Sequence, residues 1–247
     1  MSETITIRVL RYDPDKDAEP RFEDFIVPYR DEWVVLDALA YIKEALDPSL
    51  AYRGSCHMAV CGSCGMMINR QPKLACHSFI RDYRGQLVTV EPLDHFPIER
   101  DLIVDQDDFI EKLTSLYPYL VTEHDKPLSE GPNLQSPAEL AAFRPFTQCI
   151  NCLLCYAACP QVAINEAFVG PAALAIAHRY NKDSRDSGEE LRSEVTDSHH
   201  GVWDCTFVGA CSEVCPKNVD PAAAIQRTKI SASFRWLKER LLPGGTS

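Results

Sequence analysis

The sequence predicts an α+β protein made of two domains, a strand-rich domain over residues 1–105 and a helical domain over residues 106–247. Three observations lead to this prediction. The length of 247 residues exceeds that of one average domain. Short runs of alternating apolar and polar residues occupy the N-terminal part, whereas helical periodicity dominates from about Asp107. The eleven cysteines form one group in the first domain and two groups in the second.

The elements expected in the first domain follow from the spacing of its apolar residues. Alternation over Ile5–Val9 and Phe25–Val27 predicts two short strands, each with one face toward a core. Apolar residues then recur at i, i+4, i+7 and i+11 between Trp33 and Leu46, which predicts an amphipathic helix that stops near Pro48. The apolar side chains of this helix are Val35, Leu39, Ile42 and Leu46. Further expected elements are strands at Met66–Ile68 and Leu87–Val90 and a turn region at Asn69–Pro72.

The second domain carries signals for the start of a helix at three places. Ser136 is followed by Pro137 and, three residues on, by Glu139, which is the pattern of a capping box. Gly170-Pro171 and Asp220-Pro221 open two further helices, of which the second is expected to run to about Leu242. The intervening segments are interpreted as a connecting loop at Glu123–Pro137 and a solvated helix–loop face at Asn181–Asp197.

Composition and charge exclude several classes of protein. A hydrophobic fraction of 45% and a charged fraction of 25% are those of a globular protein, neither disordered nor collagen-like. A net charge of −11 disfavours binding to a nucleic-acid backbone. We expect no export signal at Met1–Thr6 and no membrane span, since the longest apolar run, Pro171–Ala177, is too short. Cysteines in a reducing compartment are expected to bind metal rather than form disulfides.

The first cysteine group has the spacing of a plant-type [2Fe–2S] ferredoxin, C-x4-C-x2-C with a fourth cysteine at a distance. Two irons bridged by two sulfides need four terminal thiolates, and three of them come from one tight loop. The expected ligands are Cys56, Cys61, Cys64 and Cys76. Three glycines of the loop are expected to let backbone N–H groups approach the sulfurs: Gly54, Gly62 and Gly65.

A structural zinc site is the alternative for this group. Zinc pairs a C-x2-C motif with a second close pair of ligands, which here would be Cys61 and Cys64 with Cys76 and His77. Cys56 would then have no role, so the spacing favours the iron–sulfur cluster.

The second and third groups repeat the run of a bacterial ferredoxin, in which the fourth cysteine serves the other cluster. The first copy reads C-x2-C-x2-C-x3-C-P from Cys149, and the second copy has the same frame from Cys205. Superposing the copies predicts a [4Fe–4S] site with the ligands Cys149, Cys152, Cys155 and Cys215. The other site receives Cys159, Cys205 and Cys211.

One ligand position of the last site is occupied by Val208, which cannot coordinate iron. A [3Fe–4S] cluster is therefore the expected occupant, and a [4Fe–4S] cluster with an exogenous ligand is the alternative. All eleven cysteines are then ligands, and none remains as a nucleophile. Neither a dinucleotide-binding glycine motif, a P-loop nor an H-E-x-x-H motif occurs in the sequence. The chain is expected to carry electrons between partners that hold the substrate chemistry.

The C-terminal segment is basic, whereas the chain as a whole is acidic. Residues 226–247 carry five basic residues and the single acid Glu239. The basic residues are Arg227, Lys229, Arg235, Lys238 and Arg240. This segment is interpreted as a docking face for membrane-embedded subunits or anionic lipids, and the alternative is the usual enrichment of cations at a helix C-terminus. Near the three-cysteine site in the sequence are Trp203, Phe207 and Pro160. They are interpreted as part of the docking face, with a core that shields the cluster as the alternative.

The motifs CGSCGMMIN, CINCLLCYAACPQ, FVGPAALAIAHRYNKDSRD and GVWDCTFVGACSEVCPKNVDPAAAI together resemble the iron–sulfur subunits of bacterial quinol:fumarate reductases. The related succinate dehydrogenase subunits have the same frame. The resemblance covers nearly the whole chain. It implies an N-terminal β-grasp domain of the plant-ferredoxin type and an all-α domain of the bacterial-ferredoxin type. It also implies a peripheral position at the cytoplasmic face of the cell membrane.

The resemblance further implies partners and a direction of electron flow. In this family an FAD-containing flavoprotein subunit holds the dicarboxylate site, and hydrophobic subunits anchor the complex. Quinone binds between the anchor and the face near the [3Fe–4S] cluster, where Gln226 and Lys229 match residues close to menaquinone. Pro160, Thr206 and Phe207 fall in the same neighbourhood. Succinate dehydrogenases often have His at the position of Thr206, so menaquinol-linked fumarate reduction is expected, with succinate oxidation or a soluble ferredoxin-like adaptor as alternatives.

Overall fold

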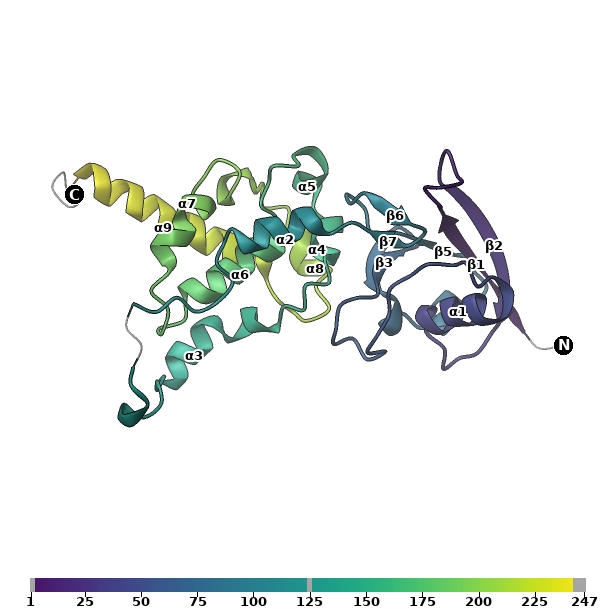
Figure 1. Ribbon diagram of the computed structural model, residues 1–247, viewed down its shortest axis with the longest axis horizontal. Helices are drawn as coiled ribbons and strands as arrows, with labels where there is room; N and C mark the ends of the chain where they lie inside the picture. Colours follow the sequence, from purple (N-terminus) through teal and green to yellow (C-terminus); the bar gives the residue numbers. More distant parts are fainter. Residues whose placement is uncertain (1–2, 124–125, 242–247) are drawn as a thin grey trace. The chain divides into compact units, whose positions relative to one another are not determined.

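The computed structural model describes residues 3–123 and 126–241, and its chain divides into two compact units (Figure 1). The first unit comprises Met1–Gln106 together with Ile150–Ala158, and the second comprises Asp107–Cys149 together with Cys159–Ser247. The α+β fold class is confirmed, with the strands in the first unit and a helical second unit. Residues Ile150–Ala158, which include Cys152 and Cys155, thus pack with the first unit, although the chain on both sides of them belongs to the second.

A five-stranded mixed sheet forms the first unit, with the order β2-β1-β5-β3-β4. Its strands are β1 (Thr4–Arg11), β2 (Arg21–Pro28), β3 (Gly65–Ile68), β4 (Gln71–Leu74) and β5 (Val88–Glu91). β1 pairs with β5 in parallel, and the other pairs are antiparallel. The predicted alternation is confirmed, because Ile7, Val9 and Val27 are almost fully buried. Smaller elements are β6 (Ile98–Arg100), β7 (Ile103–Val104) and α4 (Leu154–Ala157).

The predicted helix of the first unit is confirmed for its first turns and changes character at its end. α1 spans Val35–Tyr41 and lies beside the sheet, and a π-helical turn follows at Ile42–Leu46. Val35, Leu39 and Ile42 are fully buried, but the side chain of Leu46 is 47% exposed. A π turn holds more residues than an α turn, so the last apolar position rotates away from the buried face.

The expected turn at Asn69–Pro72 is shorter than predicted. Only Asn69 and Arg70 form the turn, both with positive φ (48° and 62°), as the two-residue hairpin turn of type I′ requires. Gln71 and Pro72 already belong to β4, the last strand of the sheet order. Proline is tolerated there because an edge strand does not need every N–H as a donor.

A buried arginine connects several segments of the first unit. The Arg11 side chain is 6% exposed and donates to Asp101 (3.0 Å), Glu23 (3.0 Å), Asp47 and Ser49. Asp101 in turn accepts from the backbone of Tyr12 and Ala51. The Ser49 hydroxyl and the Arg11 guanidinium lower the pKa of Asp47 to about 2. The charged form of Asp47 therefore stabilises the folded chain.

Acid should weaken this network within a defined pH range. Because the folded-state pKa of Asp47 is depressed, its contribution is complete above the unfolded value near 4 and is lost as the pH falls through about 2. We expect a loss of ~1–2 kcal/mol over this range, after allowance for solvent screening. Urea unfolding of the full chain at a series of pH values measures it. The Asp47→Asn variant should show a flatter profile, and an unchanged profile would contradict this account.

The second unit is built from helices. They are α2 (Asp107–Thr114), α3 (Pro137–Phe143), α5 (Pro160–Ile164), α6 (Pro171–Asn181), α7 (Glu189–Thr196), α8 (Ala210–Glu213) and α9 (Pro221–Leu241). Three of them, α3, α6 and α9, begin where the sequence predicted. The capping box of α3 is confirmed in both directions, Glu139 N to Ser136 Oγ (3.2 Å) and Ser136 N to the Glu139 carboxylate (2.7 Å). α6 and α9 pack side by side (Figure 1). Leu242, the predicted end of α9, lies outside the described residues.

The segment Asn181–Asp197 is a solvated face only in part, because some of its charged side chains are buried. Arg192 is 0% exposed and forms a two-point ion pair with Asp186 (2.6 and 2.9 Å). It also donates to the backbone carbonyls of Leu116, Tyr117 and Tyr119. Part of the charge of this segment is therefore paired and buried, and Arg192 holds the chain that follows α2.

Candidate iron–sulfur sites

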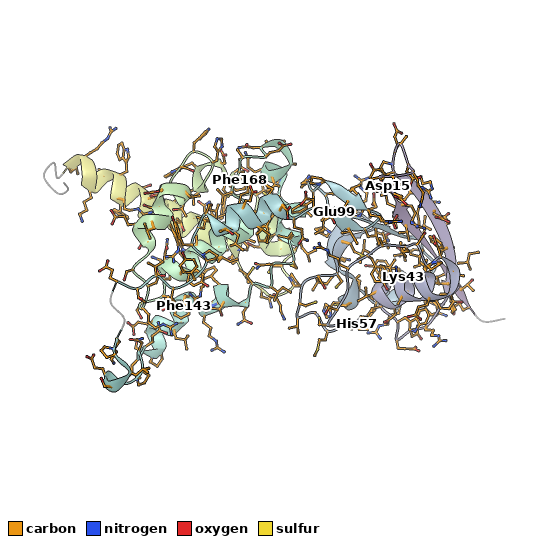
Figure 2. All side chains as sticks on the ribbon, viewed as in Figure 1. Asp15, Lys43, His57, Glu99, Phe143 and Phe168 are labelled. Atoms are coloured by element: carbon orange, nitrogen blue, oxygen red, sulfur yellow. The ribbon has the colours of Figure 1, made fainter. Side chains whose placement is uncertain are left out.

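The loop that carries the first cysteine group wraps its backbone around one sulfur. The N–H groups of Met58, Val60 and Cys61 donate to Cys56 Sγ at 3.5, 3.3 and 3.3 Å. These donors lower the pKa of the Cys56 thiol to about 6, so the thiolate that binds iron is favoured. Figure 2 shows His57 on this loop, where its exposed side chain does not take part in these bonds.

Two further thiols of the group, those of Cys64 and Cys76, lie side by side. Ala59 N donates to Cys76 Sγ (3.3 Å), and Cys64 lies beside Cys76, after the hairpin β3–β4 has brought the chain back. Burial raises the pKa of Cys64 to about 12, so iron would displace a proton from a neutral thiol there. A polar contact that the spacing did not reveal joins Ser63 Oγ to Cys61 Sγ (3.1 Å).

The loop glycines have a different role from the predicted one. The N–H donors to sulfur come from residues 58–61. Gly62 and Gly65 instead allow the backbone of Ile150 and Cys152, in the second cysteine group, to approach the loop closely. A Cβ atom on Gly62 would lie 2.6 Å from Ile150 O, and one on Gly65 would lie 2.7 Å from Cys152 O. Gly62 also has a φ of +77°. The first cysteine loop therefore packs directly on the backbone of the second group.

Substitution of Gly62 should disrupt this contact. Gly62→Ala introduces a methyl group against backbone and forces alanine into a left-handed conformation, so we expect a loss of about 2 kcal/mol or more. Thermal unfolding of the full chain and its iron content report the loss. Gly85→Ala is the matched control, because Gly85 has a similar φ (+74°) but open space around its Cβ. Equal effects of the two substitutions would contradict the packing argument.

The three cysteines predicted to hold the [3Fe–4S] cluster line one pocket in the second unit. Cys159, Cys205 and Cys211 contribute to its wall together with Val208, the residue at the predicted empty ligand position. Their thiols influence one another electrostatically, and burial raises the pKa of Cys159 and raises that of Cys211 to about 11. Neutral buried thiols around one pocket fit a cluster that binds them as thiolates. Three sulfur donors with a valine beside them fit a three-iron cluster better than a four-iron cluster.

Of the four predicted [4Fe–4S] ligands, two belong to each unit. Cys149 and Cys215 pack against one core cluster of the second unit, formed by Phe146, Ala175, Val219 and Ala224. Cys152 and Cys155 belong to the segment that packs with the first unit. The grouping of these four cysteines at one cluster stays a prediction from their spacing.

The described part of the chain contains neither a single-ion site nor a helix that could span a membrane. Within residues 3–123 and 126–241, no three His, Cys, Asp or Glu side chains converge on a single-ion position. Thiolates of a polynuclear cluster bind different irons and need not converge on one point. In the same part of the chain, no helix is long and apolar enough to cross a membrane.

The residues expected near quinone lie on one side of α9, three positions apart. The Nε2 atom of Gln226 is buried and has no hydrogen-bond partner among the described residues. Lys229 is half-buried, and its ammonium donates to the carbonyl of Cys205 at 2.7 Å. Trp203 and Phe207 are 46% and 59% exposed, so they do not form a buried core around the cysteines. The bond of Lys229 to a predicted ligand residue could not be found from spacing alone.

Comparison with known proteins agrees with these sites. The family described as "2Fe-2S iron-sulfur cluster binding domain" matches residues 6–111, and the family described as "4Fe-4S dicluster domain" matches residues 145–219. Fold and sites thus define an iron–sulfur protein with a plant-type and a bacterial-type ferredoxin part.

Relatives over the full length narrow this class. The chain is 50% identical to the fumarate reductase iron-sulfur subunit of Haemophilus influenzae, with 99% of each chain covered. It is 37% identical to the succinate dehydrogenase iron-sulfur subunit of Coxiella burnetii, over 91% of this chain and 95% of that one. A chain of the Mycobacterium smegmatis Sdh1 complex superposes with a TM-score of 0.85 at 27% identity, covering 95% of this chain and 98% of that one. The chain belongs to the family of fumarate reductase and succinate dehydrogenase iron–sulfur subunits.

Proposed function

We propose that this chain carries electrons from menaquinol to the FAD of a flavoprotein subunit, which reduces fumarate to succinate. The observation that carries the proposal is the pocket of three cysteines with Val208 at its wall, in a chain that also matches a 2Fe-2S family and a 4Fe-4S dicluster family. Bound iron–sulfur clusters pass single electrons, which suits a chain placed between two-electron cofactors.

The ligands follow the sequence assignment. We propose that the [2Fe–2S] site uses Cys56, Cys61, Cys64 and Cys76, all within the domain 1–105, and that the domain 106–247 binds the other two clusters. The [4Fe–4S] site would use Cys149, Cys152, Cys155 and Cys215, and the [3Fe–4S] site Cys159, Cys205 and Cys211. The contact of Gly62 with the Cys152 segment supports a direct passage between the first two sites.

The relatives support fumarate reduction as the direction. The identity to the Haemophilus fumarate reductase subunit is 50%, against 37% to the Coxiella succinate dehydrogenase subunit. Thr206 follows the first ligand of the three-iron site, where succinate dehydrogenases often carry histidine. Succinate oxidation is the second candidate, because the same chain can pass electrons in either direction.

An exposed apolar stripe on α9 supports a membrane anchor as the second partner. Ile230, Phe234, Leu237 and Leu241 recur at i, i+4, i+7 and i+11, and all are 43–67% exposed. Basic side chains flank the stripe, among them Lys238 and Arg240 in the last turn. We propose that hydrophobic anchor subunits cover this stripe and hold the chain at the cytoplasmic face of the membrane. A soluble adaptor would have no use for such a stripe.

Detachment from the anchor tests the proposed function. Phe234→Asp should release the chain from membranes and abolish most quinol-linked fumarate reduction, because a charge in a covered apolar surface is unfavourable. Reduction of fumarate with an artificial dye as electron donor should persist. Leu128→Asp is the matched control, since Leu128 is 99% exposed and lies far from α9 in the sequence. Wild-type complex without menaquinol oxidation, or a colourless, iron-free protein, would contradict the proposal.

A further inference from the structure

The sulfurs of the first cysteine group have different kinds of hydrogen-bond donor. Backbone N–H groups donate to Cys56 Sγ from three residues and to Cys76 Sγ from Ala59. Cys61 Sγ instead lies 3.1 Å from the side-chain hydroxyl of Ser63. Cys61 is the exposed cysteine of the group. A side-chain donor therefore serves the ligand residue that is most open to solvent.

The fold of the loop holds Ser63 beside Cys61. Gly62, the residue between them, has a φ of +77°, which turns the chain so that the side chain two positions after Cys61 reaches its sulfur. Gly62 is buried against the backbone of Ile150, and Cys64, on the other side of Ser63, is 2% exposed. Because both neighbours of Ser63 are fixed by packing, the backbone that carries the hydroxyl is held in place.

Bound iron would fix the direction of this hydrogen bond. Between a free thiol and a hydroxyl, either atom could be the donor. Cysteine binds iron as a thiolate, which has no proton to donate. The Ser63 hydroxyl then donates and Cys61 Sγ accepts. The side chain of Ser63 is half-buried, so water competes only in part for this bond.

A donor at this sulfur acts unequally on the two oxidation states of a [2Fe–2S] cluster. The reduced cluster carries one more negative charge than the oxidised cluster, and part of this charge lies on the ligand sulfurs. Hydrogen bonds to a more negative acceptor are stronger, so the O–H group stabilises the reduced cluster more than the oxidised one. Hydrogen bonds to the sulfurs are among the factors that set the reduction potential. Removal of the hydroxyl should therefore lower this potential.

We propose that Ser63 is a positioning residue that raises the reduction potential of the [2Fe–2S] site through the sulfur of Cys61. Its hydroxyl makes this site a better electron acceptor. The inference rests on the proposed ligand set of the [2Fe–2S] site. A purely structural role, in which the hydroxyl only shapes the loop, would leave the potential of the assembled cluster unchanged.

Redox titration of the purified complex, followed by EPR of the reduced [2Fe–2S] cluster, tests the inference. At the wild-type midpoint potential, Ser63→Ala should raise the ratio of oxidised to reduced [2Fe–2S] cluster about fivefold. This corresponds to about 40 mV, at about 59 mV per tenfold for a one-electron couple. Ser63→Thr keeps the hydroxyl and should keep the ratio within about twofold of the wild-type value. The potential of the three-iron cluster should not change in any of these variants.

Two further variants serve as controls. Ser55→Ala removes a hydroxyl from the same loop and should not move the ratio, because Ser55 is exposed and has no hydrogen bond to sulfur in the described part of the chain. Ser63→Val has the shape of threonine without the hydroxyl. It should repeat the fivefold shift, and it replaces Ser63→Ala if that variant does not assemble.

Two outcomes would overturn the inference. One is an unchanged ratio in the assembled Ser63→Ala or Ser63→Val complex. The other is loss of the [2Fe–2S] signal in both variants, which would assign the hydroxyl to assembly of the site instead of to its potential. Failure of the proposed ligand set would show earlier, as a wild-type complex without a [2Fe–2S] signal.

Discussion

Val208→Cys is expected to convert the three-iron site into a four-iron site. The substitution places a thiol at the wall of the pocket lined by Cys159, Cys205 and Cys211, and it restores the C-x2-C-x2-C spacing of a four-iron site. The residue is at the mouth of the pocket, since its side chain is 63% exposed, so the smaller cysteine meets no steric barrier.

EPR of the purified complex measures this conversion. The signal of the oxidised three-iron cluster should fall to a small fraction of the wild-type intensity, and a second reduced four-iron signal should appear. Val208→Ala is the control, because it changes the side-chain volume without adding a thiol. A three-iron signal of full intensity in Val208→Cys would contradict the ligand assignment.

Arg192→Leu is expected to have the largest effect on stability. The substitution leaves Asp186 as a buried, unpaired carboxylate and removes the donors to three backbone carbonyls of residues 116–119. Breaking a buried ion pair of this kind costs about 3–5 kcal/mol. Urea unfolding of the full chain measures the free energy of unfolding.

An exposed ion pair supplies the control for Arg192. Arg8 forms a two-point pair with Asp24 that resembles the pair of Arg192 in geometry, but both side chains are at least 40% exposed. Arg8→Leu should therefore change stability little. Neutralising the partner as well, in Arg192→Leu with Asp186→Asn, should recover part of the loss. A similar small effect of Arg192→Leu and Arg8→Leu would show that burial does not decide the outcome.

Local signals in the sequence predicted much of the fold. The capping box at Ser136, the Gly170-Pro171 start and the alternation in β1 depend only on neighbouring residues, and each is found in the structure. The incorrect predictions concern the burial of side chains that depends on the local helix type or on contacts with distant segments. Leu46 is exposed because the helix widens into a π turn, and Arg192 is buried because carbonyls 76 residues earlier in the chain accept its hydrogen bonds.

The candidate sites show the same division. The cysteine spacing predicts the ligand sets, since three ligands of each site come from short motifs or from a repeated frame. The structure places Ala59 N against Cys76 Sγ, the Cys152 segment against Gly62 and Lys229 against the Cys205 carbonyl. These contacts join residues 17 or more positions apart, so no local pattern indicates them. The ligand assignments themselves stay predictions.

A redox titration of the purified wild-type complex, followed by EPR, counts the bound clusters and identifies the type of each. If eleven cysteines hold three clusters and Val208 takes the place of a twelfth ligand, we expect three separate signals. These come from a [2Fe–2S], a [4Fe–4S] and a [3Fe–4S] cluster, with the three-iron site more oxidising than the four-iron site. Two four-iron signals without a three-iron signal, or no iron–sulfur signal at all, would contradict this ligand assignment.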